Sequence, residues 1–177
     1  MKKLIAVSGS SGDDDNLSKF ALDSAERVGH YIAEKGGVLI CGGKNGIMEA
    51  AARGAKRGGG LTIGILPASK ERANKFIDIA IPTYMGYLRN YLLITSADAV
   101  IGIAGRWGTL NEISLALNLA KPTVVLKGSG GWADILSRPE LTEGYKTRPY
   151  VAESAKEAVQ LAFSLLHCQP RQVKGEQ

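Results

Sequence analysis

Short apolar segments alternate along this chain with longer stretches in which apolar residues recur at helical spacing. This alternation is typical of parallel sheets whose strands are joined by crossover helices. Because the apolar runs are continuous, each strand is expected to be buried on both faces. The candidate strands are residues 4–9, 38–43, 61–67, 77–82, 99–105 and 122–127. The sequence therefore predicts a Rossmann-like, doubly wound α/β fold, with a mainly parallel sheet of about six or seven strands and helices on both faces.

Helices are expected between these strands, where small and apolar residues recur every three or four positions. The candidate helices are residues 17–35, 47–57, 84–97, 109–119, 132–136 and 154–166. Asp15 or Asn16 is placed to cap the first of them, and Thr109 to cap the fourth. The second carries alanine and glycine on its inward face, so it is expected to pack closely and to bring its N-terminus near the strand ends.

Length and composition predict one cytoplasmic domain. With 177 residues, 45% of them hydrophobic, the chain can fill a core over residues 1–168, and residues 169–177 are expected to form a flexible tail. Two cysteines, Cys41 and Cys168, make no disulfide framework, and no apolar run approaches the ~20 residues of a membrane helix. The net charge of +5 comes from scattered lysine and arginine, so nucleic acid is not an expected partner.

Glycine-rich turns follow three of the predicted strands: SGSSGDDDN at 8–16, CGGKNGIM at 41–48 and GIAGRWGTLNE at 102–112. Ligands of open parallel sheets bind beyond the carboxyl ends of the strands, where helix N-termini attract anions. Two such turns that lead into helices indicate one shared pocket for a phosphate-bearing ligand. Neither is a Walker loop, because GGKNG lacks the spacer and the Lys-Ser/Thr ending. The predicted ligand-binding residues are Gly9, Ser10, Gly42, Gly43, Gly46, Met48, Gly105, Arg106, Trp107, Gly108 and Thr109.

Several polar and aromatic side chains near these turns have two interpretations each. Arg89 stands in an apolar helix, where it either reaches water or points at an anion. Glu112 either faces the same pocket or is an ordinary solvent-exposed helix residue. Trp107 either stacks on a ligand ring or serves in packing or a subunit contact. The run Asp13–Asp15 is better explained as a solvated, helix-capping loop than as a Mg²⁺ site, so no metal ligand is predicted.

The motifs GGKNGIM, MGYLRN and AGRWGTLNE, in this order, resemble those of the Lonely Guy and molybdenum-cofactor-carrier superfamily. Its members have been labelled lysine decarboxylases and are distantly similar to the Rossmann domain of DprA. Members of the Lonely Guy type are phosphoribohydrolases that cut the N-glycosidic bond of a nucleoside monophosphate. The resemblance implies that Arg89 and Glu112 would act at the ribose, and that glycines 43, 46, 105 and 108 with Thr109 would hold the phosphate.

Three departures from the Lonely Guy pattern favour the carrier branch of this superfamily. Ala104-Gly105-Arg106 stands where the pattern has Pro-Gly-Gly, Asn111 replaces the first of two glutamates, and Asn90 replaces a lysine. The resemblance therefore implies a binding protein for a nucleoside monophosphate or a molybdopterin-like ligand, with molybdopterin cofactor as the carried molecule. The phosphoribohydrolase remains the alternative, and lysine decarboxylation is not expected because no lysine has a Schiff-base setting. As in similar proteins, a homodimer or homotetramer is expected.

Overall fold

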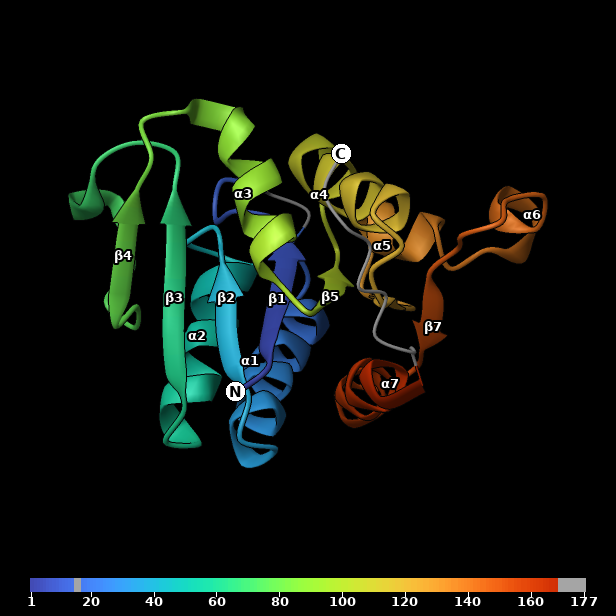
Figure 1. Ribbon diagram of the computed structural model, residues 1–177, viewed down its shortest axis with the longest axis horizontal. Helices are drawn as coiled ribbons and strands as arrows, with labels where there is room; N and C mark the ends of the chain where they lie inside the picture. The colour runs from blue at the N-terminus through green and yellow to red at the C-terminus, as the bar shows by residue number, and fades with distance from the viewer. Residues whose placement is uncertain (15–16, 169–177) are drawn as a thin grey trace.

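The computed structural model describes residues 1–14 and 17–168. Its centre is a sheet of seven parallel strands in the order β4-β3-β2-β1-β5-β6-β7 (Figure 1). The strands are β1 Leu4–Gly9, β2 Val38–Cys41, β3 Leu61–Leu66, β4 Ile79–Pro82, β5 Ala99–Ile103, β6 Thr123–Leu126 and β7 Tyr150–Ala152. This confirms the predicted Rossmann-like α/β fold, with every strand pair parallel.

The winding of the sheet reverses beside β1. The chain first builds outward through β2, β3 and β4, and then returns to the other side of β1 with β5, β6 and β7. Ile5 of β1 is therefore in register with Leu39 of β2 on one side and with Ala99 of β5 on the other. Loops that leave the carboxyl ends of β1 and β5 diverge to opposite faces, which opens a crevice at this switch point.

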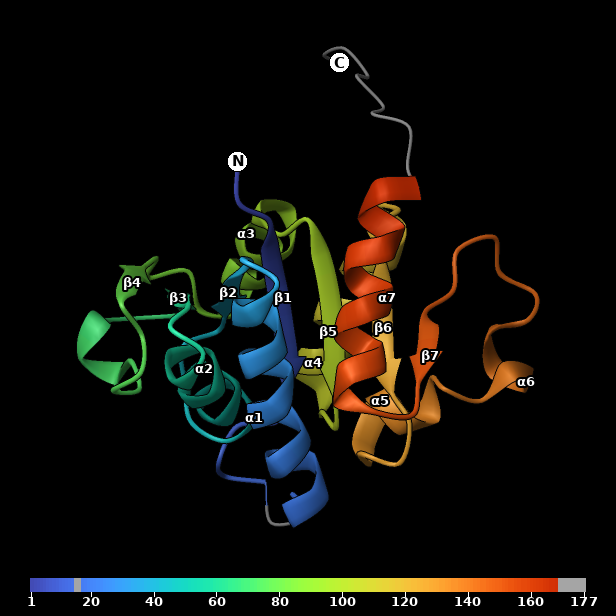
Figure 2. The same ribbon diagram turned by 90° about the horizontal axis from the view of Figure 1, so that it is seen from below.

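Helices cover both faces of the sheet (Figure 2). The helices α1 Lys19–Glu34, α2 Ile47–Arg57 and α7 Ala155–Cys168 lie on one face, and α3 Arg89–Ser96, α4 Trp107–Asn118 and α5 Gly131–Ile135 on the other. Short 3₁₀ helices η1 Lys70–Arg72 and η2 Gly86–Leu88 lie in loops, and α6 Pro139–Thr142 protrudes on the connection to β7. Ile5 and Val7 pack on the first face and Ala6 on the second, as strand alternation requires.

The helices α1 and α2 approach each other backbone to backbone. A Cβ atom added to Gly54 of α2 would lie 1.8 Å from the carbonyl oxygen of Glu26, and one added to Gly29 of α1 would lie 1.9 Å from that of Ala51. The small residues of α2 therefore allow the expected close packing, and the backbone that they approach most closely is that of α1. Ala50 and Ala51 are fully buried beside this contact.

The structure corrects several expected boundaries. The helix expected over 84–97 is the 3₁₀ turn η2 followed by α3, because Tyr84 and Gly86 have φ of 55° and 54° and break a continuous helix. The helix expected at residue 109 begins at Trp107, so its N-cap is Arg106 and not Thr109.

The N-cap of α1 is Ser18, whose hydroxyl accepts a hydrogen bond from the amide of Ala21. Asp15 and Asn16, the expected caps of this helix, lie outside the described residues. The three-residue strand β7 was not among the six candidate strands. Within the described part of the chain, none of the helices has the length and apolar character needed to cross a bilayer.

Candidate functional site

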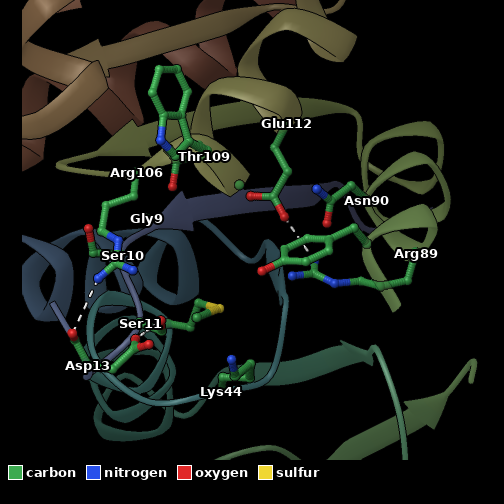
Figure 3. Close-up of a pocket in the computed structure, with 14 residues that line it drawn as sticks. Gly9, Ser10, Ser11, Asp13, Lys44, Arg89, Asn90, Arg106, Thr109 and Glu112 are labelled. Carbon is green, nitrogen blue, oxygen red and sulfur yellow. Dashed lines mark hydrogen bonds and ion pairs between the residues drawn. The ribbon is translucent and has the colours of Figure 1, made fainter. Parts of the chain in front are cut away.

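A polar pocket lies at the switch point, beyond the carboxyl ends of β1, β2 and β5 (Figure 3). The loops after these strands, the first turns of α4 and the start of α3 form its walls. Its lining residues are Gly9, Ser10, Ser11, Asp13, Lys44, Met48, Tyr87, Arg89, Asn90, Arg106, Trp107, Gly108, Thr109 and Glu112. The pocket thus brings together residues that are up to about a hundred positions apart in the chain, and it includes both members of the predicted Arg89 and Glu112 pair.

Arg89 and Glu112 form a buried ion pair in the pocket wall. Arg89 Nη1 donates to Glu112 Oε1 at 2.9 Å, and the side chains are only 10% and 7% exposed. The hydroxyl of Ser8 donates to the other carboxylate oxygen. The anion that Arg89 faces is therefore Glu112, and neither side chain takes the solvent-exposed alternative. Burial raises the pKa of Glu112, while Arg89 and Ser8 act in the opposite direction.

Gly42 makes room for this arginine. A Cβ atom at Gly42 would lie 2.6 Å from Arg89 Nη2 and 2.9 Å from the sulfur of Met48. Gly42 is not in the pocket lining, so it contributes to the site by contacting the Arg89 guanidinium and not by contacting a ligand. Any larger residue at this position would push the guanidinium away from Glu112.

The turn after β5 presents the N-terminus of α4 to the pocket. Gly105 has φ of 107°, and a Cβ atom there would lie 2.4 Å from Thr109 Cβ, so only glycine fits this turn. Its amide donates to Ser10 Oγ at 3.1 Å, which ties the loop after β1 to the loop after β5. No side chain among the described residues caps α4. Its first turn, with Gly108 and Thr109 in the lining, therefore offers backbone N–H groups and a positive dipole end.

Arg106 does not fill the space at this turn. Its Nη1 donates to the carbonyl oxygen of Asp13 at 3.2 Å, so the side chain reaches across to the loop after β1 (Figure 3). Lys44, on the loop after β2, is exposed and also lines the pocket. The pocket is thus lined by two cations, Arg106 at the N-terminus of α4 and Lys44 on the loop after β2.

The turn after β2 is arranged differently. Gly46 is the N-cap of α2 with φ of 73°, and a Cβ atom there would lie 2.6 Å from the carbonyl oxygen of Ser10. The amide of Ile47 donates to that same oxygen at 3.0 Å. The N-terminus of α2 is thus packed against the loop after β1. Gly43 and Gly46 are not in the pocket lining, which receives Lys44 and Met48 from this turn instead.

Sequence reasoning did not select six of the residues that build the site: Ser8, Ser11, Asp13, Lys44, Tyr87 and Asn90. Lys44 could have been found as the lysine inside GGKNG, and Ser8 as a hydroxyl in an otherwise apolar strand. Asp13 accepts from the hydroxyl of Ser11. Asp15 lies outside the described residues, and among the others no three His, Cys, Asp or Glu side chains gather at metal-binding distance.

Aromatic and sulfur side chains complete the surroundings of the site. Trp107 is 74% exposed and lies at the pocket, with its ring centroid 5.3 Å from that of the half-buried Trp132 on α5. Cys41 at the end of β2 is fully buried, and burial raises the pKa of its thiol to about 12. A thiol with such a pKa is not a nucleophile at neutral pH, so Cys41 is a small packing residue.

Comparison with solved structures finds molybdenum-cofactor proteins over nearly the whole chain. The molybdenum cofactor binding protein of Rippkaea orientalis has a TM-score of 0.84 and 35% identity, and the match covers 94% of this chain and 98% of that one. The molybdenum cofactor carrier protein of Chlamydomonas reinhardtii has a TM-score of 0.79 and 30% identity, with 94% and 99% coverage.

Sequence comparison finds relatives of two kinds. A protein of Archaeoglobus fulgidus is 41% identical over 160 residues, which are 90% of this chain and 94% of that one. A cytokinin riboside 5′-monophosphate phosphoribohydrolase of Mycobacterium tuberculosis is 34% identical over 96 residues, about half of either chain. These matches confirm the resemblance to the Lonely Guy and molybdenum-cofactor-carrier superfamily. A family model for the SLOG cluster4 family matches residues 2–159, and the chain belongs to this family.

Proposed function

We propose that this protein binds a phosphorylated small molecule, a nucleoside monophosphate or the molybdenum cofactor, and holds it without chemical change in the cytoplasm. The observation that carries the proposal is the first turn of α4, which opens without a side-chain cap into a pocket that the cations Lys44 and Arg106 also line. Backbone amides and a helix dipole that point at one place favour a phosphate group there. The solved relatives that bind or carry the molybdenum cofactor support the same role.

The size of the pocket is consistent with a ligand that is only partly enclosed. Its volume is about 200 Å³, below the 300–1,000 Å³ typical of sites that enclose a drug-sized ligand. A phosphate near Thr109 would occupy the inner part, and the ring system of a nucleotide or pterin would extend toward the rim. Trp107 is exposed at that rim and offers a flat surface for stacking.

A phosphoribohydrolase is the second candidate function, and the position of Glu112 favours it. This carboxylate lies in the pocket wall with a raised pKa and an arginine partner, and such a group can steady an oxocarbenium-like centre or position water. The relative from M. tuberculosis with this activity supports the assignment over half of the chain. Glu112 is held by both Arg89 and Ser8, which leaves it less free to move a proton.

Thermal unfolding with added ligands tests the binding function. We expect AMP or a phosphorylated pterin at a hundred times its Kd to stabilise the protein by ~2.7 kcal/mol. Lys44→Ala should weaken that binding about tenfold, because a charge-assisted contact is lost. Lys146→Ala, on the exposed loop before β7, is the matched control and should bind as the wild type does. If no phosphorylated compound raises the melting temperature, the binding function is refuted.

The same samples decide between the two functions. Chromatography of AMP after long incubation should show no free adenine if the protein only binds. Release of adenine and ribose 5-phosphate by the wild type, and its loss in Glu112→Gln, would establish the hydrolase instead.

We further propose that the protein assembles into a homodimer or homotetramer through α3 and the turn before it. Exposed apolar and aromatic side chains cluster there: Tyr84, Met85, Tyr87, Leu88, Tyr91 and Leu92. Apolar patches of this kind on a folded chain mark contact sites. Leu88→Glu should convert the assembly to monomers in light scattering coupled to gel filtration, whereas Leu141→Glu on the protruding α6 should not. A wild-type protein that is already monomeric would refute the assembly.

A further inference from the structure

The side chain of Asn90 is buried in the pocket wall with half of its hydrogen-bonding capacity unused. Asn90 is 2% exposed, and its Nδ2 donates to Asn111 Oδ1 at 2.7 Å. Its Oδ1 has no hydrogen-bond partner, and among the described residues it is the one buried side-chain nitrogen or oxygen in that condition. Buried polar atoms are almost always paired, so an unpaired carbonyl oxygen requires an explanation.

The place of Asn90 in the pocket wall indicates that the missing partner is a ligand. Asn90 follows Arg89 at the start of α3, and both side chains lie on the same side of the pocket as Glu112 (Figure 3). Arg89 donates to Glu112, and the amide half of Asn90 is bonded to Asn111. Both Glu112 oxygens already accept hydrogen bonds, so the unused acceptor of this wall is the Asn90 oxygen, whereas the N-terminus of α4 offers donors.

A structural role does not explain the unpaired oxygen. The partner of the Asn90 amide, Asn111, is itself exposed and can bond to water. A leucine at position 90 has the same branched shape, although it is larger, and leaves no polar atom unpaired. An asparagine that lowers the stability of the free protein is expected where a bound ligand supplies the hydrogen-bond donor that its oxygen lacks.

We propose that Asn90 is a ligand-binding residue whose Oδ1 accepts a hydrogen bond from an uncharged donor of the bound molecule. This inference rests on the proposed function, since the phosphate of the same molecule lies at the N-terminus of α4. The ligand class is thereby narrowed to phosphorylated molecules that carry a hydroxyl or amino group on the side away from the phosphate. A sugar hydroxyl and a ring amino group both supply this chemistry.

Substitution of Asn90 separates a ligand contact from a structural one. Asn90→Leu should raise the melting temperature of the free protein by about 2 °C or more, because an unpaired buried carbonyl is removed. The same variant should bind AMP about tenfold more weakly in calorimetry, with less than about twofold change for inorganic phosphate. Asn90→Asp retains the acceptor oxygen but adds a negative charge, so it should weaken AMP and phosphate together.

Two analogues identify the donor. If the donor is the sugar hydroxyl, the wild type should bind 2′-deoxyAMP about tenfold more weakly than AMP; if it is the ring amino group, purine riboside 5′-monophosphate should show that loss. Asn90→Leu should bind AMP and the sensitive analogue equally well, because the substitution and the change in the ligand each remove the same hydrogen bond.

Two outcomes would overturn the proposed role of Asn90. A lower melting temperature of Asn90→Leu with wild-type affinity for AMP would make Asn90 structural, and the binding function would stand. Failure of the wild type to bind either AMP or inorganic phosphate would instead refute the binding function, and the role of Asn90 with it.

Discussion

Replacing Arg89 by methionine is expected to destabilise the protein by about 3–5 kcal/mol at neutral pH, because it leaves the buried Glu112 carboxylate without its cation. Methionine retains most of the apolar stem of the side chain, so the loss measures the charge more than the packing. Chemical denaturation at pH 7.5 gives the value as the free energy of unfolding.

The pH dependence of this loss has a defined sign. Burial already raises the folded-state pKa of Glu112 above its ordinary value of 4.5. In the wild type the stability contributed by Glu112 is therefore fully present below pH 4.5 and declines as the pH rises through the folded-state pKa. Without Arg89 the pKa rises further and the decline is larger. The difference between wild type and Arg89→Met should therefore be smaller at pH 5 than at pH 7.5.

A double variant provides the control. Arg89→Met with Glu112→Gln has no buried charge and should recover much of the lost stability, as replacement of buried pairs often does. A single Arg89→Met variant that is as stable as the double variant at pH 7.5 would show that the unpaired Glu112 carboxylate is not the cause of the loss.

Replacing Gly54 by alanine is expected to destabilise the protein by about 3 kcal/mol or more, although alanine is the better helix former by ~1 kcal/mol. The added methyl group would be placed 1.8 Å from the backbone oxygen of Glu26, and a backbone atom cannot move aside as a flexible side chain can. For a chain of this length the melting temperature should fall by on the order of 10 °C.

Gly144→Ala is the matched control for this substitution. A Cβ atom at Gly144 meets nothing within 4 Å, so alanine there should change the melting temperature little. Equal stability of Gly54→Ala and the wild type would mean that α1 and α2 do not pack backbone to backbone.

The sequence alone could predict the sheet and most helices, because continuous apolar strands and helical periodicity are local signals. The strands expected to reach residues 43 and 105 end at Cys41 and Ile103. Positive φ at Gly43, Ala104 and Gly105 turns the chain away from the sheet there. The strand β7 has only three residues, too few for any period. The apolar residues before α3 have helical spacing, but they are exposed and belong to a turn.

The candidate site was predictable in its position but not in its contacts. Gly9, Arg106 and Thr109 could be placed in one pocket, because strand ends of a parallel sheet share an edge. Which amides face the pocket depends on tertiary packing. No glycine pattern reveals that the carbonyl oxygen of Ser10 accepts a hydrogen bond from the first amide of α2. The unpaired oxygen of Asn90 follows from how α3 meets α4, which leaves no signal along the chain.

The chain contains only two tryptophans, and both lie beside the pocket, one on α4 and one on α5. Its intrinsic fluorescence therefore originates almost entirely from the neighbourhood of the site. A molecule that enters beside Trp107 should change the emission intensity or shift its maximum, without any attached dye. The protein thus carries a built-in optical reporter, with which a compound library can be screened in solution before the ligand is known.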